Sequence, residues 1–127
     1  MYDPPGMREL VAVVREFLER QAMPALEGRL AFHARVAANA LGIVERELER
    51  GPAAALAERE RLRSLLGSDD PLDAQNRELC RRLRSGELGL GTPGLVDHLR
   101  ATTLEKLAVD QPRYAGYRRA LERRSES

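Results

Sequence analysis

The sequence has few of the residues that cross-link a chain, bind metals or stack on ligands: it contains one cysteine, no tryptophan, and only 4% aromatic residues. A single cysteine excludes an internal disulfide and a cysteine-based zinc cluster. No apolar run approaches the roughly 20 residues of a membrane-spanning helix, and the N-terminus lacks the apolar core of a signal peptide. We therefore expect a cytoplasmic protein without a metal centre or a cofactor.

Lysine is also nearly absent, because Lys106 is the only one among 21 basic residues. The formal charge of the whole chain is only +1, but residues 112–127 hold five arginines and two glutamates. The length of 127 residues fits one domain. We predict a single helical domain over 1–127, with an N-terminal arm over 1–6 and a frayed C-terminal tail over about 119–127.

Turn residues divide the sequence into segments with helical periodicity, and no segment shows the two-residue alternation of a strand. Gly51-Pro52 and Gly86 are expected to end helices, because glycine and proline favour helix ends. The pattern predicts an all-α fold, a single bundle of five to six helices packed around a long central second helix. The expected helices are about 7–23, 25–50, 53–66, 72–85 and 93–109, followed by a short sixth helix that carries Tyr114, Tyr117 and Leu121.

The second predicted helix, about 25–50, has an apolar arc of about 200°, which indicates neighbours on more than one side. Arg29 and His33 fall within this arc, and Asn39 lies at its edge. A buried cation without a partner is very costly. The three residues are therefore either a buried polar network that fixes helix register or the lining of a pocket for a small anionic ligand, and acid–base catalysis by His33 is a further alternative.

No catalytic set is apparent elsewhere in the chain. Cys80 lies on the apolar stripe of the fourth predicted helix and is expected in the core, whereas His98 beside Asp97 is expected to be exposed. The glycine-rich segment 86–94 lacks the phosphate-loop pattern and is expected to be a connecting loop. These observations predict neither catalytic residues nor metal ligands.

A second cluster lies near the C-terminus, where tyrosines alternate with arginines. Its members are Arg113, Tyr114, Tyr117 and Arg118. Such a surface could stack on bases and contact phosphates, so nucleic-acid binding is an alternative function. The other interpretation is that both tyrosines pack one turn apart against the bundle.

Two stretches resemble a bacterial family known only as a domain of unknown function. They are ALEGRLAFHARVAANALGIVERELERGP (25–52) and LAVDQPRYAGYR (107–118), within a likeness that extends from about Tyr2 to Arg118. Members of that family are often encoded beside, or fused to, aminoglycoside-phosphotransferase-like kinases and acyl-CoA dehydrogenases. The resemblance implies a helical accessory domain in acyl-CoA or related lipid metabolism, and it supplies no catalytic residues.

The sequence thus favours a non-enzymatic accessory or interaction domain that supports a phosphotransferase-like kinase or an acyl-CoA dehydrogenase. The alternative is a small anionic-ligand binding protein or weak enzyme that uses Arg29, His33 and Asn39. A wide apolar arc on one long helix also predicts a symmetric homodimer that buries part of this arc.

Overall fold

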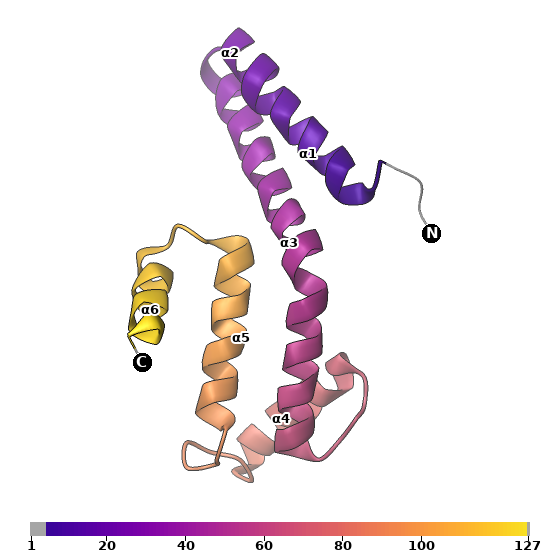
Figure 1. Cartoon of the computed structure of the whole chain (residues 1–127), viewed down its shortest axis with the longest axis vertical. Coiled ribbons are helices and arrows are strands. Elements are labelled where there is room, and N and C mark those ends of the chain that lie inside the picture. Colours follow the sequence, from indigo (N-terminus) through magenta and orange to yellow (C-terminus); the bar gives the residue numbers. More distant parts are fainter. Residues whose placement is uncertain (1–4, 127) are drawn as a thin grey trace. The chain divides into compact units, whose positions relative to one another are not determined.

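The computed structural model describes residues 5–126, and every regular element in that range is a helix (Figure 1). The all-α prediction is therefore confirmed for the part of the chain that the structure describes. The predicted arm over 1–6 lies mainly outside it. The elements are α1 (Met7–Phe17), the π-helix η1 (Leu18–Ala22), α2 (Met23–Ala25), α3 (Gly28–Leu66), α4 (Leu72–Ser85), α5 (Leu95–Asp110) and α6 (Ala115–Ser125).

The chain divides into two compact units, Met1–Gly51 (unit 1) and Pro52–Ser127 (unit 2). The long central helix of the prediction is α3, which begins in unit 1 and ends in unit 2. That the chain forms one domain remains a prediction.

Three consecutive helical segments occupy the region where one helix over 7–23 was predicted. Gly6 is the N-cap of α1, and η1 widens the helix just before Pro24. Proline has no backbone N–H and cannot continue the regular hydrogen-bond ladder, so a one-turn widening at this point is a local accommodation. The chain then turns back through Leu26, in an extended conformation, and Gly28, whose φ of +59° favours glycine.

The prediction that Gly51-Pro52 ends the second helix is wrong, because α3 continues through both residues to Leu66. The predicted helices over 25–50 and 53–66 are parts of this one helix. Pro52 removes one backbone donor, and Gly51 does not adopt the left-handed conformation typical of a helix end. The segment AAALA after Pro52 consists of strong helix formers, so the local propensity outweighs the break.

In unit 1, α1 lies beside the first part of α3 (Figure 1). The buried residues among 5–51 are all small, namely Ala34, Ala38 and Gly42 on α3, and α1 has no buried residue. Ion pairs join the two helices: Arg15 pairs with Glu45, and Arg8 lies 3.4 Å from Glu49. Small residues allow the helices to approach closely, but they leave most of the large apolar side chains outside the contact.

Unit 2 has a core of large aliphatic side chains, formed by Leu62, Leu66, Leu79, Leu88 and Leu95. The predicted helix over 72–85 is confirmed as α4, and it ends at Gly86 with a φ of +82°. The buried Gln75 fixes the turn before α4, because its Nε2 donates to the Ser68 carbonyl at 2.9 Å.

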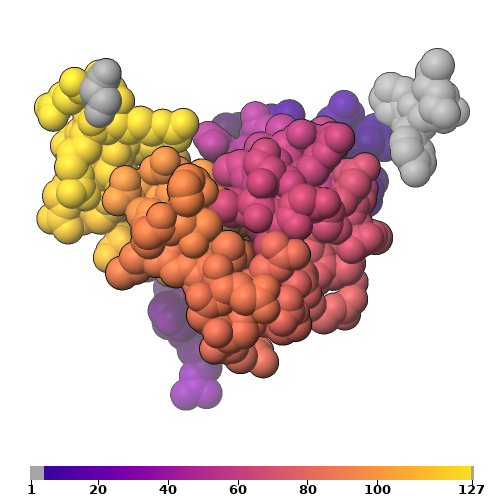
Figure 2. All heavy atoms as spheres, turned by 90° about the horizontal axis from the view of Figure 1, so that it is seen from below, coloured from indigo at the N-terminus to yellow at the C-terminus, as the bar shows by residue number. Residues whose placement is uncertain are grey.

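The C-terminal part of unit 2 differs from the sequence prediction. The helix α6 lies beside α5 (Figures 1 and 2) and continues to Ser125, so residues 119–125 are helical rather than frayed. Cys80 is exposed rather than in the core. Its neighbour Leu79 occupies the buried position of that turn, which places Cys80 about 100° away on the outer face.

Candidate functional site

A polar network centred on Arg61 joins α3 to α5 within unit 2. The Nε of Arg61 donates to His98 Nδ1 at 3.0 Å. Its two terminal nitrogens donate to Glu105 at 3.0 and 3.2 Å, and Nη2 also donates to Thr102 Oγ1 at 3.2 Å. A guanidinium group is suited to this arrangement because it presents several donors in one fixed plane.

This network determines the protonation state of His98. Only 2% of the residue is exposed, and Nδ1 accepts a hydrogen bond, so the neutral ring carries its proton on Nε2. Burial of the ring, together with the nearby charge of Arg61, lowers the pKa of His98. A buried, neutral imidazole that accepts a hydrogen bond from an arginine is suited to fixing the contact between the two helices.

The expectation that His98 is exposed is therefore wrong. The buried residues of α5 are Leu95, His98, Ala108 and Val109, whereas Val96 and Leu99 are exposed. The spacing of His98, Thr102 and Glu105, at i, i+4 and i+7, was a signal for the face that contacts Arg61, because it places all three on one side of a helix. The partner Arg61 could not be identified from sequence, since it lies 37 residues away from His98.

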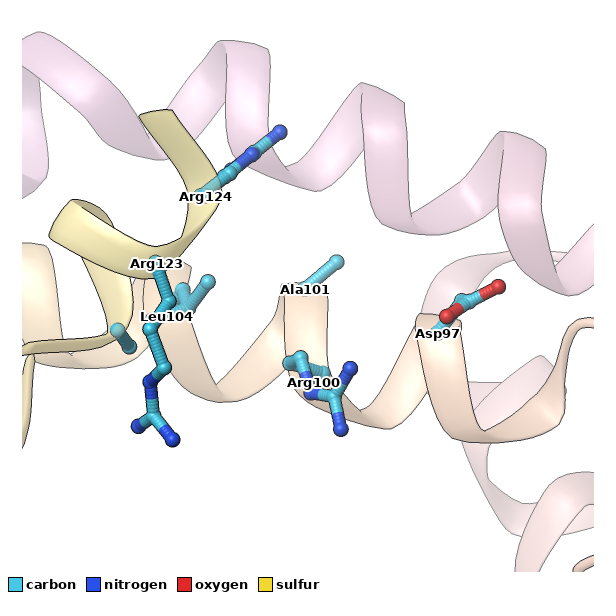
Figure 3. A pocket seen from close by; sticks show the side chains of 7 residues that line it. Asp97, Arg100, Ala101, Leu104, Arg123 and Arg124 are labelled. Atoms are coloured by element: carbon cyan, nitrogen blue, oxygen red, sulfur yellow. The ribbon is translucent and has the colours of Figure 1, made fainter. Parts of the chain in front are cut away.

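A groove of about 500 Å³ lies between α5 and α6. Its lining combines an apolar floor with charged side chains, and Figure 3 shows Arg100 and Arg123 extending to one side of the groove and Arg124 to the other. Asp97 is the one acidic residue in the lining. A groove with three guanidinium groups and one carboxylate has the chemistry to attract an anion. The lining residues are Asp97, Arg100, Ala101, Leu104, Ala120, Arg123 and Arg124.

The structure places the residues of the predicted polar cluster on one helix, in the unit 1 part of α3. Arg29, His33 and Asn39 are all exposed, so they do not form a buried network within the chain. The reason is that α3 packs on α1 through its alanine and glycine face, and the arc that carries these residues points away from that contact. His33 makes an edge-on contact with the Phe32 ring at 5.7 Å. Ligand binding by these three residues remains a prediction.

The C-terminal cluster is divided between surface and interior. Tyr117 is buried, whereas Tyr114 is 53% exposed and precedes the first residue of α6. Arg113 and Arg118 are exposed. The two tyrosines therefore do not form a paired stacking surface, and only Tyr117 packs in the interior, whereas the alternative interpretation expected both to do so.

Unit 1 carries a stripe of large apolar side chains on α1 that remains half exposed. We call Met7, Leu10, Val14 and Phe17 the α1 stripe; these positions lie at i, i+3, i+7 and i+10. The exposed fractions of Leu10, Val14 and Phe17 are 52, 49 and 53%. An amphipathic helix with its apolar side uncovered is typical of a protein–protein contact surface.

Neither a metal-binding cluster nor a membrane-spanning helix is found among residues 5–126. No cluster of three or more histidine, cysteine, aspartate or glutamate side chains there is arranged to hold a metal ion. No helix within the same residues is both long enough and apolar enough to cross a membrane.

These features define the class: an all-α protein whose prominent surface features are exposed apolar helix faces and an arginine-lined groove. The chain belongs to the family described as a domain of unknown function, DUF6285, whose model matches residues 24–114. This match covers all of the first stretch that carried the resemblance, 25–52, and residues 107–114 of the second. No curated protein and no solved structure matches the chain.

Proposed function

We propose that the protein is a non-enzymatic helical accessory domain that docks on a partner protein through the α1 stripe. The observation that supports this proposal most directly is the half-exposed set of Leu10, Val14 and Phe17 on α1. Their spacing, i, i+4 and i+7, is the pattern by which an amphipathic helix anchors in an apolar groove of another protein. A cytoplasmic location is part of the proposal.

The partner we propose is a phosphotransferase-like kinase or an acyl-CoA dehydrogenase, because the family resemblance implies such enzymes as neighbours. The chain would supply a rigid helix with large side chains, and the enzyme would supply the groove that covers them. Burying three half-exposed apolar side chains contributes roughly 2–4 kcal/mol of favourable transfer free energy, which is sufficient to be detected in a binding measurement.

The test is co-expression of the tagged full-length chain with a phosphotransferase-like kinase and, separately, with an acyl-CoA dehydrogenase, followed by pull-down and calorimetry with the purified pair. We expect one of the enzymes to be retained, and the variant Val14→Asp to weaken its binding at least tenfold, because a carboxylate would have to enter an apolar groove. Leu90→Asp is the matched control, since Leu90 is 88% exposed in the loop before α5. Failure of both enzymes to bind or to change activity would contradict the proposal.

A second candidate function, the binding of a small anionic ligand, is favoured by the groove between α5 and α6. Arg100 and Arg124 line this groove together with Leu104 and two alanines, so a ligand with a phosphate or carboxylate and an apolar portion would fit its chemistry. Titration with pyrophosphate followed by calorimetry tests it. We expect binding that weakens about tenfold in Arg100→Ala and is unchanged in Arg84→Ala, an exposed arginine on α4; equal effects of the two variants would exclude the groove.

A further inference from the structure

Two exposed residues of opposite charge, Arg29 and Glu47, lie near the two ends of one face of the unit 1 part of α3. Arg29 and Glu47 are 18 residues apart, which is about five turns of an α-helix, so they share the same angular position. Phe32, Val36 and Ile43 lie within about 60° of that position. We call these five residues the α3 stripe.

The α3 stripe is uncovered in the chain. Phe32, Val36 and Ile43 are 56, 49 and 37% exposed. The stripe lies roughly opposite the buried Ala38 of the same helix, so α1 does not cover it. Neither Arg29 nor Glu47 forms an ion pair with a residue among 5–126, although Arg8 and Arg15 are paired with glutamates of α3.

We propose that a second copy of this chain covers the α3 stripe, with the two α3 helices antiparallel about a two-fold axis near Ala38. In that arrangement position n of one helix faces position 76−n of the other. Arg29 then faces Glu47 of the second copy, and the same ion pair forms again at the other end. A two-fold interface requires this self-complementarity, and the sequence of the stripe has it.

The apolar positions between the two ion pairs follow the same register. Val36 lies opposite Ala40 of the second copy, so a large side chain meets a small one close to the two-fold axis. Phe32 lies at the edge of the stripe, where Ile43 of the second copy is on the same side at nearly the same level. Close packing between the helices requires these side chains to interdigitate. The charged residues stand at the ends of the contact and the apolar residues occupy its centre, as in protein–protein interfaces generally.

The occupant we infer is therefore a second copy rather than another segment of this chain or another protein. A parallel pairing is disfavoured because it would place Arg29 against Arg29 and Glu47 against Glu47. The inference does not rest on the proposed docking through the α1 stripe, because the two stripes are on different helices. It makes specific the homodimer that the apolar arc predicts, and it gives Arg29 a role in assembly.

The experiment uses charge reversal in the full-length chain, with the dimer dissociation constant measured by analytical ultracentrifugation over a range of concentrations. Arg29→Glu places two glutamates at each end of the contact, and Glu47→Arg places two arginines there. We expect each variant alone to weaken the dimer roughly tenfold or more. The double variant, with both reversals in one chain, restores the ion pairs in inverted form and is expected to recover most of the affinity.

Mixing the two single variants gives a sharper result. A heterodimer of Arg29→Glu with Glu47→Arg has opposite charges at both ends, so the mixture is expected to dimerise more tightly than either variant alone. Val36→Asp is expected to abolish dimerisation at concentrations where the unchanged chain is dimeric. Arg35→Glu is the matched control, because Arg35 is exposed on α3 outside the stripe and its reversal should leave the dissociation constant unchanged.

Three results would overturn the inference. The first is a monomer at every concentration up to several hundred micromolar, which would leave the stripe to be covered by the chain itself or by another protein. The second is a dimer that responds equally to Arg29→Glu and Arg35→Glu. The third is a mixture of single variants that shows no preference for the heterodimer, which would exclude the antiparallel register. Circular dichroism of each variant establishes that the helices are retained.

Discussion

Arg61 carries more of the contact between α3 and α5 than any other single polar side chain. It donates to three different residues of α5, and only about a quarter of its side chain is exposed. Removing it would leave the Glu105 carboxylate and His98 Nδ1 without their partner in a partly buried site. The resulting loss of folding stability is larger than that from removing a surface ion pair, because the Glu105 and His98 groups remain desolvated.

We therefore predict that Arg61→Ala lowers the free energy of unfolding by about 2–4 kcal/mol, as measured by urea denaturation. Arg77→Ala is the control, because the Arg77–Asp73 pair is more than three-quarters exposed on both sides. Its loss should change stability by less than about 0.5 kcal/mol. Similar effects of the two variants would show that the Arg61 network does not hold the helices together in solution.

His98 predicts how stability responds to pH. The folded protein keeps the ring neutral because burial and Arg61 lower its pKa, whereas the unfolded chain takes up a proton at a pKa near the ordinary value of 6.5. Between these two pKa values the unfolded state binds more protons, so the free energy of unfolding falls as the pH drops below about 6.5.

Urea denaturation at pH 7.5 and pH 5.5 measures this dependence. We expect His98→Gln to be less stable than the unchanged chain at both pH values. From pH 7.5 to pH 5.5, however, its free energy of unfolding should fall by less than that of the unchanged chain. His33→Gln is the control, since His33 is the only other histidine and is exposed on α3. An identical pH dependence in the unchanged chain and in His98→Gln would refute this assignment.

At the scale of the element, α3 is the feature that the sequence predicted least well. Its length depends on two opposing effects at Gly51-Pro52: these two residues disfavour a helix interior, whereas the residues on either side are strong helix formers. The structure resolves this balance in favour of a continuous helix. The pair nevertheless remains a weak point, because Pro52 cannot donate a hydrogen bond to the preceding turn.

Replacing Pro52 by alanine should therefore stabilise the protein, by about 1–3 kcal/mol. Gly86→Ala should instead lower the free energy of unfolding by about 1 kcal/mol, because Gly86 ends α4 in the left-handed conformation that alanine disfavours. Thermal denaturation of the two variants measures whether the first is more stable and the second less stable than the unchanged chain. A destabilised Pro52→Ala variant would show that α3 is interrupted at this position in solution.

On the scale of the whole molecule, the two units differ in what they bury. Unit 2 encloses five leucines in one cluster, whereas the buried residues in the described part of unit 1, residues 5–51, are two alanines and a glycine. Burial of large apolar side chains is the main favourable contribution to folding, and alanine and glycine contribute little to it. Unit 1 therefore depends more strongly on what covers its apolar stripes.

We predict that a fragment of residues 52–127 unfolds cooperatively by itself, and that a fragment of residues 1–51 has low helicity at micromolar concentration. Circular dichroism during denaturation of each fragment provides the measurement. Cooperative unfolding of the fragment 1–51 at low concentration would contradict the prediction. Denaturation of the full-length chain tests the expected single domain, because one domain is expected to unfold in one cooperative transition.

Local sequence patterns alone determined the all-α class, the bounds of α4 and its end at Gly86. These depend on interactions within a few residues, such as helix propensity, hydrophobic periodicity and the freedom of glycine to adopt a positive φ. The candidate residues Arg29, His33 and Asn39 were identified as unusual for the same reason, because an arginine in an apolar arc is visible in the sequence.

Only the tertiary structure decided which face of each helix is covered. Periodicity gives the direction of an apolar arc but not its partner, and α3 packs on α1 through small residues while its large ones stay outside. His98 and Cys80 exchanged their expected environments because their burial depends on residues distant in sequence, Arg61 and the leucine cluster of unit 2. Such contacts are selected by the fit of whole helices, which no local pattern records.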